Sequence, residues 1–256
     1  MIPLWSECAR DSFATLPADT IAILPLGATE QHGPHLPYGV DTTLTEAVLS
    51  RVETHAQALQ LPTLAITKSD EHSAVPGTLT LGVSTLLATL DDIAASVART
   101  GIRRLAFFNG HGGNSAVLEI AARTARRGHG LITAHASWFA FADLSGFDAT
   151  QLPYDLHAGD VETSAMLATR PDLVAMEKAQ DFKTAMHMWE TAGHRTGLTG
   201  QPGRPGWIME DLNRDGAAGN ARAATADKGE TLLQSAADGF ARWLEDFARF
   251  DTAAAP

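Results

Sequence analysis

The sequence predicts an α/β protein, a three-layer αβα sandwich around a mostly parallel central sheet. Short apolar runs of strand length alternate along the chain with segments of helical periodicity. Polar, glycine-containing turns follow these runs, as they do at the carboxyl edge of parallel sheets. With 256 residues, 45% of them hydrophobic, the chain can build one well-packed core and is short for two. We therefore expect a single domain over residues 1–256.

The elements follow from these patterns in chain order. Strands are expected at residues 20–26, 61–67, 103–109 and 130–136. Helices are expected from 42 to about 60, from a cap at Ser84 to Gly101, over 115–127, after Asp160 and from 225 onward. The last helix carries an apolar stripe that includes Leu233, Phe240 and Phe247, and the tail 252–256 is expected to fray.

The composition excludes several classes of partner. Lys and Arg total 19 against 30 Asp and Glu, a formal net charge of −11, and the basic residues form no patch. We expect neither nucleic acid nor a membrane as partner. No run reaches about 18 continuous apolar residues, the length of a membrane span. The N-terminal residues lack the basic region followed by an apolar region that is typical of a signal peptide, so we expect a cytoplasmic protein. The single cysteine, Cys8, excludes an intramolecular disulfide and a Cys-rich zinc site.

The first motif with chemical content follows the first expected strand. Glu30 and His32 are two residues apart, so on an extended segment their side chains leave the same face. The Gly and Pro residues after them can fold the chain back to bring Asp41 near. Carboxylate oxygen and imidazole suit Zn²⁺, Mn²⁺ or Fe²⁺. The alternative for Asp41 is a helix N-cap.

Two further segments offer matching residues. His111 follows the third expected strand between glycines, which favours a tight turn over a phosphate cradle because the P-loop lysine and hydroxyl are missing. Glu162 falls in the first turn of a helix that Asp160 would cap, where its charge alone favours the helix dipole. Two imidazoles and three carboxylates at loop positions match a dinuclear divalent site, and we infer two metal ions that share Asp41.

These motifs resemble the creatininase family, the creatinine amidohydrolase-like metal-dependent amidases. The resemblance rests on residues 26–37 (LGATEQHGPHLP) with Asp41, on 71–72 (EH) with 76–78 (PGT), on 109–114 (NGHGGN), on 157–159 (HAG) with 162–164 (ETS), and on 224–229 (ATADKG). It implies a one-domain, creatininase-like α/β fold, a two-metal centre at the strand ends and hydrolysis of a non-peptide C–N bond in a small amide. It also implies a homo-oligomer, commonly a hexamer.

Carried over by position, the resemblance implies roles for individual residues. Glu30, Asp41 and His111 would hold one ion, and His32, Asp41 and Glu162 the other. His157 matches a family position near the reacting amide. The candidates for orienting these ligands or binding substrate are His35, Glu71, His72 and Gly112, for which exposed loop residues are the alternative.

One departure from the family pattern bears on the substrate. Creatininases proper carry a glutamate two residues after the strand-end histidine, where this chain has Gly113. We expect Glu162 to supply the missing carboxylate, and this argues against creatinine as the substrate. Relatives of the broader type act on formamides, on cyclic amides or as a peptidase in cofactor maturation.

The expected chemistry follows from the metals. Water bridging two divalent ions loses a proton near neutral pH and attacks the amide, and His157 or the Glu162 carboxylate protonates the leaving amine. Three alternatives stay open. A dinuclear phosphoesterase would use similar ligands, although no Arg or Lys cluster accompanies the motifs. The others are a non-catalytic binding module and a purely structural, closed metal site.

Two segments have no conformation that the sequence indicates. The aromatic run Trp138-Phe139-Ala140-Phe141 is typical of a core or of a subunit contact. Residues 191–220 are rich in Gly and Pro, and a loop of this length is usually functional or packed against a partner subunit. Both are candidates for determining specificity.

Overall fold

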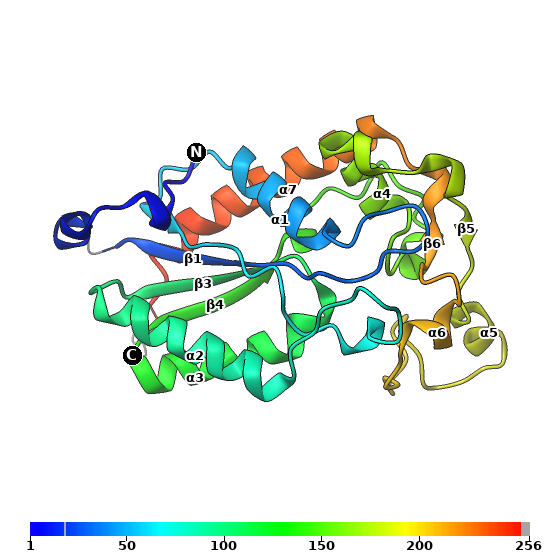
Figure 1. The fold of residues 1–256 in the computed structure, drawn as a ribbon, viewed down its shortest axis with the longest axis horizontal. Coiled ribbons are helices and arrows are strands. Elements are labelled where there is room, and N and C mark those ends of the chain that lie inside the picture. Colours follow the sequence, from blue (N-terminus) through cyan, green and yellow to red (C-terminus); the bar gives the residue numbers. More distant parts are fainter. Residues whose placement is uncertain (18, 252–256) are drawn as a thin grey trace.

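Four parallel strands form a sheet at the centre of the protein, in a computed structural model that describes residues 1–17 and 19–251. The strand order is β2-β1-β3-β4. Figure 1 labels β1, β3 and β4 side by side. The strands are β1 (Ile21–Leu26), β2 (Ala58–Gln60), β3 (Arg104–Asn109) and β4 (Ile132–Ser137). Every residue of β1 is buried, as a strand covered on both faces requires. The predicted α/β class is confirmed.

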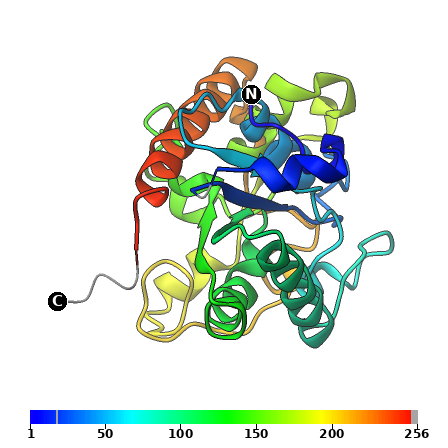
Figure 2. The same ribbon diagram turned by 90° about the vertical axis from the view of Figure 1, so that its left-hand side faces the viewer.

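Helices cover both faces of the sheet, which gives the three predicted layers (Figure 2). On one side lie α1 (Val40–Arg51), α4 (Asp160–Thr169) and α7 (Ala226–Phe247), and on the other α2 (Val83–Arg99) and α3 (Ser115–His129). Alternate residues of β1 enter different cores, since strand side chains point to opposite faces. Ile21 and Ile23 join the α1/α4/α7 core, whereas Ala22 and Leu24 join the α2/α3 core.

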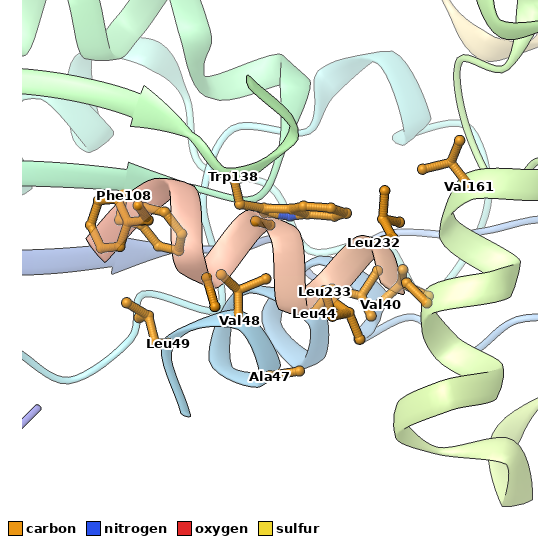
Figure 3. Close-up of a cluster of buried hydrophobic side chains, with 14 of the residues drawn as sticks. Val40, Leu44, Ala47, Val48, Leu49, Phe108, Trp138, Val161, Leu232 and Leu233 are labelled. Carbon is orange, nitrogen blue, oxygen red and sulfur yellow. The ribbon is translucent and has the colours of Figure 1, made fainter. Parts of the chain in front are cut away.

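The larger core joins the sheet, α1 and α7 (Figure 3). Phe108 of β3 packs on Phe240 of α7 with ring centroids 4.1 Å apart. Trp138 is fully buried in this core and stacks on Phe139 at 3.8 Å. Each such side chain contributes about 1.5–3 kcal/mol by leaving water. Of the two interpretations of the aromatic run after β4, the core one therefore holds for Trp138.

The region between α1 and α2 differs from the prediction. The helix expected to reach about residue 60 ends at Arg51, because Val52 takes an extended conformation (φ −69°, ψ 121°), and β2 follows at Ala58–Gln60. The strand expected at 61–67 does not form. Pro62 has no N–H to donate to a ladder, and beyond it Leu64 makes a single bridge to Leu26.

The cap expected at Ser84 is wrong, and neither Asp41 nor Asp160, the alternative caps for the other two helices, is an N-cap. α2 begins one residue before Ser84, with Gly82 at the N-cap, and α1 and α4 have Gly39 and Gly159 there. None of these glycines offers a side-chain acceptor, so other groups must satisfy the first N–H groups. The start of α7 follows the common rule, since Thr225 accepts a hydrogen bond from the Lys228 N–H at 3.3 Å.

The loop expected at residues 191–220 contains structure and lies beyond the carboxyl ends of the strands (Figure 1). Around it are α5 (Met186–Thr191), α6 (Met209–Leu212) and the antiparallel pair β5 (Asp181–Phe182) and β6 (Gly219–Asn220). A small cluster that includes Trp189 and Trp207 packs these pieces together. The tail predicted to fray, 252–256, falls outside the described residues. Among the described helices, none combines the length and hydropathy needed to span a membrane.

Candidate metal centre

All the predicted ligands come from segments that follow a strand or open a helix at one edge of the sheet. Glu30 and His32 follow β1, Asp41 lies in the first turn of α1, His111 follows β3, and Glu162 lies in the first turn of α4. The structure brings all five side chains together and buries them: His32 is 0% exposed and Glu162, the most exposed, 9%. Parallel strands bring such segments to one edge.

Asp41 lies between the two imidazoles. Its Oδ1 is 3.3 Å from His32 Nε2, and its Oδ2 is 3.3 Å from His111 Nδ1. Glu30 Oε1 lies 3.3 Å from His111 Nδ1, and Glu162 Oε2 lies 3.8 Å from His32 Nε2. Two groups of potential ligand atoms, each spanning no more than 4.8 Å, share Asp41: Glu30, Asp41 and His111, and His32, Asp41 and Glu162. Glu30, His32 and His157 form a third group within the same distance.

The chemistry of these atoms fits divalent cations. His32 Nε2 and Asp41 Oδ2 are buried without a hydrogen-bond partner, which costs about 1–3 kcal/mol per group unless something else binds them. The second nitrogen of each imidazole meets a backbone carbonyl: His32 Nδ1 lies 3.0 Å from Glu30 O and His111 Nε2 lies 2.8 Å from Lys68 O. A carbonyl oxygen only accepts hydrogen bonds, so the nitrogen beside it carries a proton. The other nitrogen of each ring faces Asp41.

Burial and charge oppose each other at these groups. Burial lowers the pKa of His32, but the charges of Asp41 and Glu162 outweigh it and raise that pKa to about 9. Burial lowers the pKa of His111, but the charge of Glu30 raises it more, so this pKa lies well above its usual value. Burial also raises the pKa of Glu162, to about 7, against the attraction of His32. The carboxylates thus favour positive charge at the site. Without a metal ion, protons bound to the two histidines supply that charge.

A strained turn presents Glu162. Ala158 has a φ of +53°, which non-glycine residues rarely adopt, and its N–H donates to Glu162 Oε2 at 2.6 Å. The expected cap Asp160 is itself the first helical residue, and its N–H donates to Asp155 Oδ2 at 2.6 Å. Burial raises the pKa of Asp155 to about 7. Sequence reasoning missed Asp155, whose only signal was an acid shortly before a helix start.

The glycines beside His111 allow close approach of the chain to itself. A Cβ at Gly110 would collide with Thr45 Oγ1, and one at Gly113 would collide with Glu71 Oε1. The tight-turn interpretation therefore fits both positions. At Gly113, where the family pattern has a glutamate, the neighbouring space is filled by the Glu71 carboxylate, while Glu162 stands on the His32 side of Asp41.

The candidates for orienting ligands or binding substrate differ in their burial and in their contacts with the ligands. His72 Nε2 is 3.5 Å from Glu30 Oε1. Glu71 Oε1 is 3.7 Å from His111 Nε2, and its other oxygen accepts from Lys68 Nζ at 2.9 Å. His35 is buried, with Nε2 2.9 Å from Thr163 Oγ1, and Gly112 is exposed.

His157 packs between two other imidazoles, with ring centroids 4.2 Å from His32 and 4.1 Å from His72. Its Nε2 is 2.7 Å from the Gln31 carbonyl, and its Nδ1 is 3.7 Å from Glu30 Oε1. Sequence reasoning also missed Ser69, whose hydroxyl donates to Glu30 Oε2. Ser69 stands in a polar loop with no pattern that would single it out.

Comparison with known proteins gives relatives along most of the chain. The creatininase family model, described as creatinine amidohydrolase, matches residues 6–244. The mycofactocin precursor peptide peptidase of Mycobacterium tuberculosis (strain CDC 1551 / Oshkosh) is 31% identical over 262 residues, 95% of this chain and 94% of that protein. The creatinine amidohydrolase of Pseudomonas putida is 33% identical over 246 residues, 87% of this chain and 88% of that protein.

Solved structures agree with the sequence relatives. The structure "Creatininase Mn" has 27% identity and a TM-score of 0.76, with 98% of this chain and 100% of that chain covered. A mutant creatininase of "Zn-Zn type" has 27% identity and a TM-score of 0.77 at the same coverage.

Fold, buried ligand cluster and relatives together define a class, the metal-dependent amidohydrolases. Within that class the chain belongs to the creatininase family. The resemblance inferred from the sequence motifs is confirmed.

Proposed function

We propose that this protein hydrolyses an amide C–N bond of a small molecule, with two divalent ions held by the five buried side chains. The observation that carries the proposal is Asp41, whose two carboxylate oxygens face different imidazoles and lie in both groups of ligand atoms. The manganese and zinc creatininases among the relatives support a divalent metal. The homohexamer that the resemblance implies stays a prediction.

The two ligand groups that share Asp41 support one ion in each. Glu30, Asp41 and His111 would hold one, and His32, Asp41 and Glu162 the other. When bound, a pair of divalent ions lowers the pKa of water and polarises the substrate carbonyl.

His157 moves the proton that the reaction must transfer. Its Nε2 proton is held by the Gln31 carbonyl at 2.7 Å, so Nδ1 is the atom that exchanges protons with the reacting groups. Burial keeps the pKa of His157 well below its usual value, so the ring starts neutral. It therefore accepts a proton from the attacking water at Nδ1 and donates that proton to the amine as the C–N bond breaks.

The burial of the site favours a small substrate. His32 and Asp41 are 0% and 3% exposed, which leaves little room for an extended chain beside them. Two lysines beside the site's segments are paired: Lys68, whose carbonyl meets His111, with Glu71 at 2.9 Å, and Lys228 with Asp160 of α4 at 2.6 Å. A dinuclear phosphoesterase would need free cations to receive phosphate, so this pairing argues against that alternative.

The test is a panel of formamides, lactams, creatinine and a short peptide, assayed for release of amine or ammonia. We expect the metal-loaded protein to hydrolyse at least one small amide and Asp41→Asn to lose that activity. Cleavage of the peptide alone would move the substrate class to that of the mycofactocin-type relatives. Hydrolysis of a chromogenic phosphate ester alone would establish the phosphoesterase. No turnover of any compound by metal-loaded protein would leave a binding module or a structural metal site.

A further inference from the structure

Gln31 contacts two histidines that face the site, through two different groups. Its side-chain Nε2 lies 2.9 Å from His72 Nδ1, and its backbone oxygen lies 2.7 Å from His157 Nε2. It stands between Glu30 and His32 but belongs to neither group of ligand atoms. Gly216 packs against its amide so closely that a Cβ there would collide with Gln31 Oε1.

The side-chain amide has one orientation. The Gly33 N–H donates to Gln31 Oε1 at 2.9 Å, which identifies that atom as the oxygen and makes Nε2 the donor toward His72. His72 Nδ1 must then accept, so a neutral His72 ring carries its proton on Nε2. That N–H points at Glu30 Oε1, 3.5 Å away.

The backbone carbonyl gives His157 the same tautomer, but the ring turns its other nitrogen toward Glu30. A carbonyl oxygen can only accept, so the proton of His157 lies on Nε2, and Nδ1 faces Glu30 Oε1 at 3.7 Å with a lone pair. The Gln31 amide also lies 3.5 Å from His157 Nε2, but both atoms carry hydrogen, so this contact is no hydrogen bond.

We propose that Gln31 is a positioning residue that fixes complementary proton placements on two stacked imidazoles, so that His72 offers an N–H and His157 a lone pair on the side of Glu30. Both atoms lie within 3.7 Å of the same oxygen, Glu30 Oε1, so they are close enough together for one amide to contact both. An amide carries one acceptor, its oxygen, and one donor, its N–H, and is the complement of this pair. The match to an amide rests on the proposed hydrolase function, whereas the proton placement does not.

The experiment is magic-angle-spinning NMR of the full-length chain labelled with ¹⁵N-histidine, in chelator-treated and zinc-loaded forms. Protonated and bare ring nitrogens have well-separated ¹⁵N shifts, and His72→Gln and His157→Gln assign the signals. The informative variant is Gln31→Glu, which keeps the oxygen that accepts from Gly33 and replaces the donor with an acceptor. Gln57→Glu, at an exposed position, makes the same chemical change away from the site.

In the wild type we expect bare Nδ1 and protonated Nε2 on both rings. In Gln31→Glu, His72 Nδ1 gains a proton and His157 is unchanged, because its partner is a backbone carbonyl. With metal content kept, kcat falls about 10- to 100-fold, the range for groups that orient catalytic or ligand side chains. Gln57→Glu leaves spectrum and kcat as in the wild type.

A wild-type His72 protonated at Nδ1 would overturn the proposal, as would a His72 signal that Gln31→Glu leaves unchanged. Should Gln31→Glu fail to fold, the wild-type spectrum alone decides. If the proton placements are as assigned but no amide is hydrolysed, the positioning role stands and the proposed function fails.

Discussion

Replacing Glu162 by Gln removes one charge from the His32 side of Asp41. Glu162 Oε2 lies 3.8 Å from His32 Nε2, and the variant keeps the size of the side chain. The other ligand group, Glu30, Asp41 and His111, does not include Glu162. The substitution therefore distinguishes two models of the site: a pair of ions that share Asp41, and a single ion held by Glu30, Asp41 and His111.

The magnitude follows from the distance. Glu162 Oε2 lies 3.8 Å from the His32 nitrogen that would hold the ion, and even two unit charges at that separation interact by about 4 kcal/mol at an effective dielectric constant of about 20, about 10³-fold in a binding constant. An ion of charge +2 in direct contact with the carboxylate interacts more strongly, so this value is a lower bound. The Glu162 side chain is only 11% exposed, so water screens little of this interaction. We expect about two ions per chain in the wild type and about one in Glu162→Gln, with the second site weakened by about 10³-fold or more.

Elemental analysis after purification without chelator measures this stoichiometry, and competition with a metal-sensitive dye measures the affinities. The matched control is Glu71→Gln. Its carboxylate also lies near a site imidazole, 3.7 Å from His111 Nε2, but outside both ligand groups, so it should keep both ions. Two tightly held ions in Glu162→Gln would refute the assignment of Glu162, and a wild type that takes up no metal would refute the centre itself.

Three further predictions test the site by other routes. His157→Ala should keep its metal and lose about 10²–10⁴-fold in kcat if His157 carries the proton, and unchanged turnover would remove it from the mechanism. Because the metal-free pKa of His32 is raised to about 9 and that of His111 lies well above its usual value, metal uptake at pH 7 should release about two protons per chain. Apparent affinity should therefore rise with pH up to about 9, and calorimetry in buffers of different ionisation enthalpy counts the protons; none released would contradict this picture. Asp155→Ala should cost about 0.5–2 kcal/mol in urea unfolding, since it removes the acceptor for the first N–H of α4, and an unchanged unfolding midpoint would argue against that role.

Strands buried on both faces could be predicted from sequence, because their burial leaves a continuous apolar run. β1, β3 and β4 lie within one or two residues of the predicted ranges. β2 could not be predicted, since its three residues, Ala58–Gln60, carry no such run and pair at the edge of the sheet. The helix starts at Gly39, Gly82 and Gly159 were missed because no side chain marks them.

The convergence of the five predicted ligands could be anticipated because topology alone brings the carboxyl ends of parallel strands together. The groups that hold them could not. Ser69 donates to Glu30, and Lys68 offers its carbonyl to His111, through contacts set by tertiary packing rather than by any spacing in the sequence. Asp155 is a similar case, since its carboxylate acts on a helix start whose position the sequence misplaced.

The partner of the second ring nitrogen distinguishes the histidines around Glu30. His32, His111 and His157 each place one nitrogen against a backbone carbonyl, at 3.0, 2.8 and 2.7 Å, and so leave the other nitrogen, which faces the acids, to bind a metal ion or a further proton. His72 meets an amide donor instead and turns an N–H toward the same carboxylate. Three of the four arrangements depend only on the course of the main chain, so side-chain substitution cannot easily change them. The fourth depends on one side chain, and Gln31 is therefore the position at which a single substitution should change a proton placement without moving a ligand.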